Sequence, residues 1–321
     1  MIRNPRRIAV TGGAGFIGSH LVDRLLKEGF EVCVIDNLYS GRLENIAHKK
    51  SNRAFRLIKG DITDFRFVKR ALRGVEAVAH AAALVDVQFS IQNPTITNEI
   101  NVGGTLNILR ACRDLGVEWV VFASSAAVYG DANPPRKNER DYPAPMSPYA
   151  VSKLASEYYI SVFNKLYGIK TTCLRYFNVY GSRQRANIHS SYGGVVSIFI
   201  SRILKGLRPL IFGDGMQSRD FVHVDDVVEA TILALSDDHA NGQIFNVGTG
   251  KSISINQVAE ILKKALDRED LSNEYMDSRP GDPRNVFADI SKARRVLGFE
   301  PKVTVKEGLT NLARCFKNES A

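Results

Sequence analysis

Apolar residues in the first half of the chain form short continuous runs that alternate with stretches of helical spacing. The runs predict six strands, at 7–13, 30–37, 55–61, 75–83, 117–125 and 170–177. The stretches between them predict helices at 16–29, 62–74, 98–116 and 147–167. Strands that are apolar along their whole length are buried on both faces, which is typical of a parallel sheet covered by helices. With right-handed crossovers, we expect a Rossmann-type, doubly wound α/β fold.

The pattern becomes looser after about residue 177. Helical spacing returns at 194–206, 225–235, 254–266 and 304–317, with the short strand-like runs PLIF, QIFNVG and NEYMD between these helices. We interpret this half as a smaller α/β substrate-binding domain that shares elements with the first. The expected boundaries are 1–176 for the Rossmann domain, with a return at about 220–247, and 177–321 for the second domain.

The composition is that of a globular protein, because 44% of the 321 residues are hydrophobic and 24% are charged. No apolar run approaches the roughly 20 residues of a membrane-spanning helix, and the N-terminus lacks the apolar region of a signal peptide. We therefore expect a cytoplasmic protein without a membrane partner. The cysteines lack zinc-ligand spacing and fit reduced thiols, so no metal site is expected; they are Cys33, Cys112, Cys173 and Cys315.

The net charge of +9 raises the question of an acidic partner. The basic residues are dispersed, however, and the chain carries no signature of a nucleic-acid-binding module. We therefore expect a mildly basic, solvated surface and no nucleic-acid partner. The charge also suits an anionic small-molecule substrate.

A glycine-rich turn, VTGGAGFIGSH, follows the first predicted strand and opens the first predicted helix. Gly12 permits the tight turn, Gly15 lets the backbone approach a pyrophosphate, and Gly18 allows the helix to pack closely on the strand. The helix N-terminus attracts the anionic phosphates. Turns need glycine even without a ligand, but this strand–turn–helix context predicts a dinucleotide-binding site.

Two aspartates follow the next predicted strands. Asp36 ends the second strand, about 20 residues beyond the glycine turn, where an acid binds the hydroxyls of the adenosine ribose. Its charge would repel a 2′-phosphate, so we expect NAD rather than NADP as the cofactor. Asp61 follows the third strand, where a contact with the adenine amino group could form. A strand-end aspartate can also serve only to start a turn.

The segment FASSAAVYG ends the fifth predicted strand and directs Ser124 and Ser125 into the cleft where open α/β sheets hold ligands. Ser147 is expected to cap the following helix, in which Tyr149 and Lys153 are four residues apart and share one face. A nearby ammonium and the helix N-terminus are expected to lower the tyrosine pKa from its usual value of about 10. A solvated Tyr–Lys pair is the commoner meaning of this spacing. Its position after the glycine turn nevertheless favours a base for a sugar or alcohol hydroxyl.

Together these motifs resemble the extended short-chain dehydrogenase/reductases, and within them the nucleoside-diphosphate-sugar epimerases. The resemblance extends from residue 7 to about 315 and rests on TGGAGFIGSH, VIDNL, GDITD, AHAAA, NVGGTLNIL, SSAAVYG, SPYAVSK, LRYFNVYG, GDGMQSRDFVHVDD and RPGDPRNVFAD. It implies an isomerase that inverts C4 of a UDP-hexose through a transient 4-keto sugar, with NAD as a bound prosthetic group. The implied substrates are UDP-glucose and UDP-galactose, and also UDP-GlcNAc and UDP-GalNAc.

The resemblance also implies roles for individual residues. Tyr149 is the expected base, Lys153 binds the nicotinamide ribose and tunes Tyr149, and Ser125 hydrogen-bonds the sugar 4-hydroxyl. The implied cofactor-binding residues are Gly12, Gly15, Phe16, Ile17, Gly18, Asp36, Asn37, Asp61, Ile62, Ala81, Ala82, Asn101, Ser124, Tyr149, Lys153 and Tyr176. The implied substrate-binding residues are Ser125, Tyr149, Asn178, Val195, Phe212, Arg219, Arg279, Asp282 and Val286.

Within the substrate-binding set, the family pattern distinguishes several contacts. Arg219 and Arg279 would clamp the diphosphate through bidentate, charge-assisted bonds, and Asn178 would hold its phosphate side. Asp282 would bind the nucleotide ribose, and Phe212 would pack against the base.

Three positions bear on the reaction and the sugar. Ala126 and Ala127 stand where related 4,6-dehydratases carry Asp-Glu and uronate decarboxylases carry a Glu. Alanine does no acid–base chemistry, so we expect simple 4-epimerisation. A bulky tyrosine at the position of Val286 would restrict the pocket to unsubstituted hexoses, so an N-acetyl group is expected to fit. UDP-glucuronate 4-epimerase is an alternative, and so is an NAD-binding regulator or scaffold, although such relatives often lose the tyrosine or the lysine.

The family commonly dimerises through the helix that carries the tyrosine and the helix before it, as a four-helix bundle. We therefore expect a homodimer. Apolar residues of these helices suit either that interface or the core, and the candidates are Leu106, Ile108, Leu109, Leu154, Tyr158 and Phe163.

Overall fold

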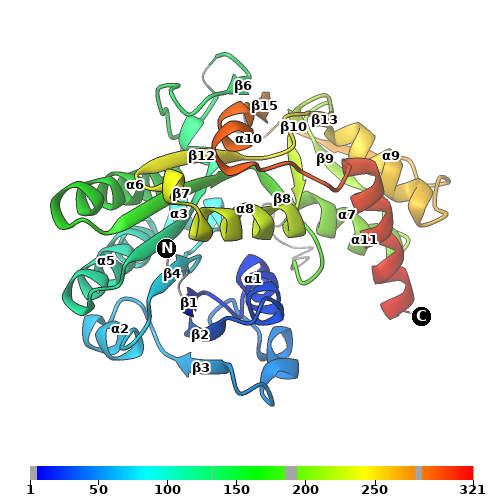
Figure 1. Cartoon of the computed structure of the whole chain (residues 1–321). Coiled ribbons are helices and arrows are strands. Elements are labelled where there is room, and N and C mark those ends of the chain that lie inside the picture. The colour runs from blue at the N-terminus through cyan, green and yellow to red at the C-terminus, as the bar shows by residue number, and fades with distance from the viewer. Residues whose placement is uncertain (1–5, 132, 185–193, 279–283, 321) are drawn as a thin grey trace.

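The computed structural model describes residues 6–131, 133–184, 194–278 and 284–320. Its centre is a seven-stranded parallel sheet with the order β12-β7-β5-β4-β1-β2-β3 (Figure 1). The strands are β1 (Arg7–Thr11), β2 (Glu31–Asp36), β3 (Phe55–Lys59), β4 (Ala77–His80), β5 (Trp119–Ser125), β7 (Lys170–Tyr176) and β12 (Gln243–Val247). The strand order reverses between β1 and β4, which is the point where open α/β sheets hold their ligands. The expected Rossmann-type fold is confirmed.

Helices cover both faces of this sheet. One layer contains α2 (Phe65–Ala71), α5 (Gly104–Leu115) and α6 (Pro148–Tyr167), and the other contains α1 (Phe16–Lys27), α8 (Val224–Ser236) and α10 (Ser291–Leu297) (Figure 1). Successive residues of a strand point to opposite faces. In β1, Ile8 and Val10 share a buried cluster with Leu21 of α1, whereas Ala9 shares one with Val68 of α2. The inner strands are mostly apolar because they lie between these two cores.

The segment between β4 and α5 is more broken than its sequence pattern predicts. It forms α3 (Val87–Gln92) and α4 (Pro94–Asn98), followed by a π-helical turn at Glu99–Gly103. Asp86 caps α3 by accepting a hydrogen bond from the backbone N–H of Phe89 at 2.9 Å. The helix expected at 98–116 is therefore regular only from Gly104 onward.

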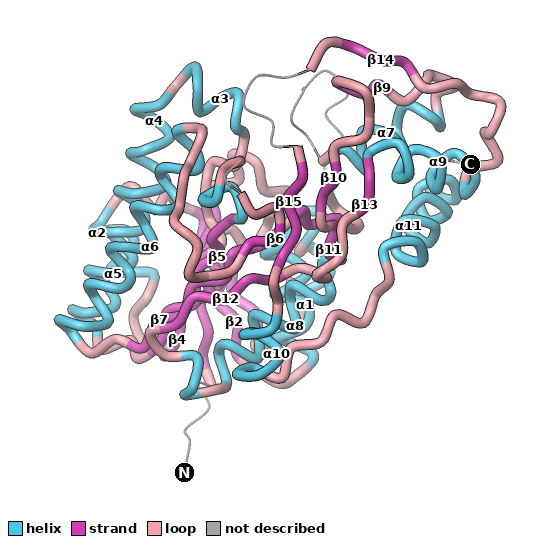
Figure 2. The backbone as a smooth tube through the Cα atoms, turned by 90° about the horizontal axis from the view of Figure 1, so that it is seen from above, coloured by secondary structure: helices cyan, strands magenta, loops and turns pink. Residues whose placement is uncertain are grey.

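A second group of elements is built around α7 (Val195–Leu204), α9 (Ile255–Ala265) and α11 (Val305–Ser320). Figure 2 shows these helices on the opposite side of the molecule from α2, α5 and α6. Their short strands are β6 (Arg136–Lys137), β8 (Asn178–Tyr180), β9 (Leu210–Phe212), β10 (Ser218–Arg219), β11 (Phe221–His223), β13 (Ile253–Ser254), β14 (Glu274–Met276) and β15 (Asn285–Ala288).

These short strands form small sheets with the order β13-β10-β15-β6, β11-β8 and β14-β9. The chain leaves the large sheet after β7 and returns to it with β12, and α8 packs on the same face as α1. The division into a cofactor domain and a substrate domain stays a prediction.

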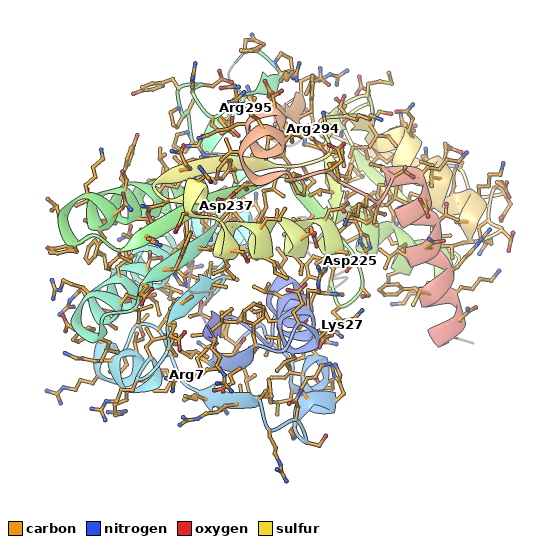
Figure 3. All side chains as sticks on the ribbon, in the orientation of Figure 1. Arg7, Lys27, Asp225, Asp237, Arg294 and Arg295 are labelled. Carbon is orange, nitrogen blue, oxygen red and sulfur yellow. The ribbon has the colours of Figure 1, made fainter. Side chains whose placement is uncertain are left out.

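Charges of both signs are spread over the outside of the helices. Figure 3 labels Arg294 and Arg295 on α10, and Asp225 and Asp237 near the two ends of α8. Many of the surface cations are paired, as Arg294 is with Glu300 at 2.7 Å. Within the described ranges, no helix is long and apolar enough to cross a membrane.

Candidate active site

The glycine turn after β1 leaves no room for side chains. Gly12 has a φ of +70°, and a Cβ there would lie 2.9 Å from backbone atoms of Ala82. A Cβ on Gly18 would lie 2.2 Å from the carbonyl oxygen of Gly12. Gly15 precedes α1, whose first turn has neither a side-chain cap nor an acidic residue. The turn is thus a backbone cradle at an open helix N-terminus, which suits a pyrophosphate.

The two predicted acids lie beside this turn with defined partners. Asp36, whose residue is 7% exposed, accepts hydrogen bonds from the backbone N–H of Ala14 at 2.9 Å and of Leu38 at 2.8 Å. The carboxylate therefore both orders the local turn and keeps lone pairs for ribose hydroxyls. Asp61 accepts from Asn37 at 2.8 Å. Burial opposes ionisation of Asp61, but hydrogen bonds from Thr63 and Asn37 outweigh it and hold its pKa below the usual value.

A directional hydrogen-bond chain runs beneath the turn. Thr105 donates to the carbonyl of Asn101, so its oxygen must accept from Nε2 of His80, 2.9 Å away. His80 is therefore the neutral Nε2–H tautomer, and its Nδ1 accepts from the hydroxyl of Thr11 at 2.7 Å. Thr11 in turn accepts from the N–H of Ala82 at 3.2 Å. Burial, reinforced by the charge of Lys153, lowers the pKa of His80 to about 3 and keeps it neutral.

Asn101, in the π-helical turn, joins the segment after β4 to α6. Its side chain accepts from the N–H of Leu84 at 2.8 Å and donates to the carbonyl of Leu84 at 2.9 Å. It also donates to the hydroxyl of Ser152 at 2.9 Å, and Ser152 donates to the carbonyl of Tyr149 at 2.7 Å. Both amide protons of Asn101 are thus used within the chain, and its expected contact with the cofactor stays a prediction.

The predicted Ser–Tyr–Lys group comes together at the end of β5. Ser147 caps α6 by accepting from the N–H of Ala150 at 3.2 Å. The side chains of Tyr149 and Lys153, on residues 9% and 3% exposed, lie on the inner face of α6. Ser125 lies close enough to Tyr149 to lower its pKa, and the Ser125 oxygen accepts from the N–H of the alanine two residues on at 3.1 Å. A hydroxyl, a phenol and an ammonium thus converge on one edge of the sheet.

The electrostatics of this group differ from the sequence-based expectation. Burial raises the pKa of Tyr149, and the hydrogen bond from Ser125 offsets only part of that rise. Lys153 does not bond the phenol, because its ammonium donates to the carbonyl of Ala123 at 2.8 Å and lies 6.0 Å from the Tyr149 ring centroid. Burial lowers the pKa of Lys153 to about 8, against the opposing charge of Glu157. The expected lowering of the Tyr149 pKa is therefore wrong for this structure, where desolvation dominates.

Ser124 and Ser125 point to different environments. Consecutive residues of a strand face opposite sides, and the Ser124 hydroxyl donates to the buried carboxylate of Glu157. The expectation that both hydroxyls reach the cleft is corrected, and Ser124 could reach a cofactor only through its backbone. Tyr176 likewise uses its hydroxyl internally, 2.8 Å from that of Thr231 on α8.

Several expected cofactor residues form the walls around these groups. Phe16 and Ile17 begin α1, and Ala81 donates its N–H to the carbonyl of Thr11 at 3.2 Å. Ile62 is buried in the core against α5. The glycine turn and the start of α6 therefore lie at the carboxyl edge of the sheet, and the cofactor contacts of these residues stay a prediction.

The expected substrate residues that the structure describes lie on short elements of the second group. Asn178 is exposed at the start of β8, Val195 begins α7, and Phe212 ends β9. Arg219 of β10 is 8% exposed, donates to the carbonyl of Ser218 at 2.8 Å, and pairs in register with Val286 of β15.

Two of the expected substrate contacts, Arg279 and Asp282, lie outside the described residues. Val286 is 6% exposed in a cluster with Tyr129 and Phe177, against which Ala126 packs. The gatekeeper position therefore adjoins the turn that carries the candidate catalytic serine.

Two charged residues in the site were not predicted. Glu157 and Arg175 form a buried ion pair next to Lys153, with Nε–Oε1 and Nη2–Oε2 distances of 2.9 and 2.7 Å. A signal for Glu157 was present, because it follows Lys153 by four residues and so shares its helix face. Arg175 offers no such signal, because its partner Glu157 lies 18 residues away in the sequence on another element.

Known proteins share these features over almost the entire chain. The sequence matches the NAD dependent epimerase/dehydratase family over residues 8–248. A UDP-glucose 4-epimerase of Mycolicibacterium smegmatis is 39% identical over 98% of this chain and 99% of its own. A UDP-glucuronate 4-epimerase of Thermodesulfobacterium geofontis is 36% identical over 94% and 93%. The structure of a UDP-N-acetylglucosamine 4-epimerase from Methanobrevibacter ruminantium, in complex with UDP-N-acetylmuramic acid, has a TM-score of 0.92 at 38% identity and covers 98% of this chain and 99% of that one.

Proposed function

Because the chain belongs to the NAD-dependent epimerase/dehydratase family, we propose that it interconverts the C4 epimers of UDP-hexoses. The proposed substrates are UDP-glucose and UDP-galactose, and also UDP-GlcNAc and UDP-GalNAc. The observation that carries the proposal is that Ser125 at the end of β5, close enough to Tyr149 to affect its pKa, and the buried Tyr149 and Lys153 of α6 come together. This group lies at the carboxyl edge of the sheet, where the glycine turn also lies.

The residues around the glycine turn fit NAD. Gly12 and Gly18 allow the close backbone packing that shapes the turn, because a Cβ at either would overlap backbone atoms, and the Asp36 carboxylate could accept from ribose hydroxyls. Asp61, held ionised by its hydrogen bonds, is placed to accept from an adenine amino group. When bound, NAD supplies the hydride acceptor that makes a sugar alcohol reversibly oxidisable.

The proton chemistry falls to the chain itself. In the proposed reaction, the phenol oxygen of Tyr149 takes the proton of the sugar 4-hydroxyl and later returns it. Ser125, which lies close enough to Tyr149 to affect its pKa, orients that hydroxyl. The Lys153 ammonium stabilises the phenolate as it forms. Loss of the proton accompanies formation of a 4-keto sugar, whose rotation about its diphosphate link presents the opposite face.

The turn after β5 favours epimerisation over related reactions. Ala126 and Ala127 follow Ser125 directly, and neither offers a group that could remove or add a proton at C5 or C6. Among the described carboxylates near this turn, Glu157 is occupied by Arg175 and Ser124, and Glu139 accepts from the backbone N–H of Asn246. A 4-keto-6-deoxy sugar as the product would contradict this part of the proposal.

The sugar preference is proposed from Val286. Its side chain lies in the cluster that borders the turn after β5, and it is smaller than tyrosine, which leaves space for a C2 substituent. Replacement by tyrosine should lower kcat/KM for UDP-GlcNAc much more than for UDP-glucose. Replacement by alanine is the matched control and should preserve the ratio.

The direct test uses the purified protein without added cofactor and a panel of UDP-sugars, followed by NMR at C4. We expect UDP-glucose and UDP-GlcNAc to reach equilibrium with their epimers, and Tyr149→Phe to abolish this. The second candidate is UDP-glucuronate 4-epimerase, because the relative from T. geofontis has that name. Conversion of UDP-glucuronate alone would replace the first proposal with the second, and no conversion of any sugar would support a non-catalytic role.

We also propose a homodimer through α6. Five apolar side chains on its outer surface are exposed by 41–69%: Val151, Tyr158, Tyr159, Val162 and Leu166. Several of the residues named from sequence are instead core, since Ile108, Leu109 and Phe163 are 0%, 0% and 7% exposed. The exposed stripe, rather than those residues, would form the contact.

A further inference from the structure

A buried ion pair lies alongside the proposed catalytic group. The side chains of Arg175 on β7 and Glu157 on α6 are only 3% and 2% exposed. Removing both charges from water is unfavourable, and a pair of apolar residues often stabilises a core equally well. Stability alone therefore gives little reason for an ion pair at this place.

The contacts of the pair extend to the site. Oε1 of Glu157 accepts from the hydroxyl of Ser124 as well as from Arg175. The guanidinium of Arg175 lies over the ring of Tyr129 at 4.7 Å, and the Tyr129 hydroxyl donates to Asn246 of β12 at 2.6 Å. The pair thus ties α6 to β7, to the end of β5 and to the turn that follows it.

Glu157, the anionic member of the pair, is on the same helix as Lys153. Tyr149, Lys153 and Glu157 are spaced by four residues and share the inner face of α6. Burial lowers the pKa of Lys153, and the charge of Glu157 opposes that effect. Among the described residues, this is the carboxylate that acts on the ammonium.

The other groups that face Lys153 do not supply a negative charge. From β5, the carbonyl of Ala123 accepts its proton and the ring of Phe122 lies 4.8 Å away. His80 of β4 is neutral, because burial lowers its pKa to about 3.

The groups on β7 and α6 do not supply a negative charge either. From β7, burial raises the pKa of the Cys173 thiol and keeps it neutral, and Arg175 is cationic. From α6 and the turn after β5, Tyr149 and Tyr129 both have raised pKa values and are neutral phenols.

We propose that Glu157 is a positioning residue that keeps Lys153 protonated and, through Ser124, fixes the end of β5 so that Ser125 faces Tyr149. Arg175 holds the carboxylate in place through two hydrogen bonds. The inference rests on the proposed function, because it assigns Glu157 a role in the same proton chemistry. It adds to that function a carboxylate that acts on the substrate only through other residues.

The test is the pH profile of kcat/KM for the holoenzyme, measured on Glu157→Gln. The amide keeps the shape but not the charge, so the alkaline limb should move to lower pH by about one unit. At pH 9 the loss relative to wild type should be about tenfold greater than at pH 6.5. Glu157→Asp, which keeps the charge, should restore the position of the limb.

Two further variants separate charge from folding. Glu157→Gln leaves Arg175 buried without an opposite charge, so the double variant Glu157→Gln/Arg175→Met removes both charges and should fold and retain NAD. Its alkaline limb should also move to lower pH. The matched control is Asp226→Asn on α8, which removes a carboxylate that is 3% exposed and bonds the N–H of Lys302 at 2.8 Å. The alkaline limb of Asp226→Asn should lie at the same pH as that of wild type.

A readout without turnover distinguishes this inference from the proposed function. The pKa of Lys153 is followed by 13C NMR of labelled lysine side chains, with Lys153→Arg used for assignment. A Lys153 pKa that is unchanged in the folded double variant overturns the inference, whatever the activity. If wild type epimerises no sugar but its Lys153 pKa falls on loss of Glu157, the proposed function fails and the electrostatic role stands. If activity falls equally at all pH values and the alkaline limb does not move, the ion pair has a purely structural role.

Discussion

Gly18 is the position where a single methyl group should test the cofactor cradle most sharply. In Gly18→Ala, the new Cβ would lie 2.2 Å from the carbonyl oxygen of Gly12, 2.8 Å from its carbonyl carbon and 2.9 Å from Cα of Gly13. All three are backbone atoms, so no side-chain rotation can relieve the overlap. Either α1 must move away from β1, or the turn itself must shift.

The size of the effect follows from these contacts. Overpacking in a close-packed core destabilises by roughly 1–3 kcal/mol, and a rigid backbone neighbour places this variant near the upper end. For a protein of this size, each kcal/mol corresponds to about 2 °C in Tm. We therefore expect Tm to fall by about 6 °C. NAD affinity should fall as well, because the displaced atoms belong to the turn that would bind the pyrophosphate.

The assay is thermal unfolding of the protein at fixed cofactor content, together with titration of NAD. Gly103→Ala is the matched control, since Gly103 has a φ of −61° and a Cβ there would meet nothing within 4 Å. Replacing that helical glycine should raise stability by about 0.5–1 kcal/mol and leave NAD binding unchanged. If Gly18→Ala has the Tm and NAD affinity of wild type, the cradle geometry described above is not the one the protein adopts.

Three further outcomes are expected. Asp36→Asn replaces an acceptor of two backbone N–H bonds with an amide that can satisfy only one, so NAD affinity measured by calorimetry should fall by about tenfold or more. His80 is neutral when folded and has an ordinary pKa of 6.5 when unfolded, so stability should fall by about 2 kcal/mol from pH 6.5 to 5, and urea titrations of His80→Gln should show less of this loss. Leu166→Glu on the exposed stripe of α6 should shift the molar mass seen by light scattering to that of one chain, whereas a wild type that is already monomeric would remove the proposed dimer.

The sequence predicted the parts of the site that depend on spacing along one element. Gly12, Gly15 and Gly18 are fixed by a strand–turn–helix pattern, and the four-residue step from Tyr149 to Lys153 by helix periodicity. The same periodicity places Glu157, four residues after Lys153, on the same helix face, so its position could also have been predicted. Adjacent residues of a strand point to opposite faces, so the different orientations of Ser124 and Ser125 could also have been predicted.

Other features depend on segments far apart in the chain. Short strands such as β10 and β15 have two and four residues, and no pattern of that length distinguishes a strand from a loop. They exist because Arg219 and Val286 are brought into register across 67 residues. The raised pKa of Tyr149 is similar in origin, because it reflects burial among several elements that a local reading of charges does not include.

The two faces of helix α6 carry different groups of residues. Its inner face carries Tyr149, Lys153 and Glu157, whose positions must be held closely for proton transfer. Its outer face carries the exposed apolar stripe, for which no partner exists within the described part of the chain. A rigid helix transmits any displacement of one face to the other, so covering the stripe would also restrict the inner face. Hydrogen bonds of Asn101 and Ser152 also fix α6 to the segment after β4, so any self-association would act on a helix whose orientation is already set.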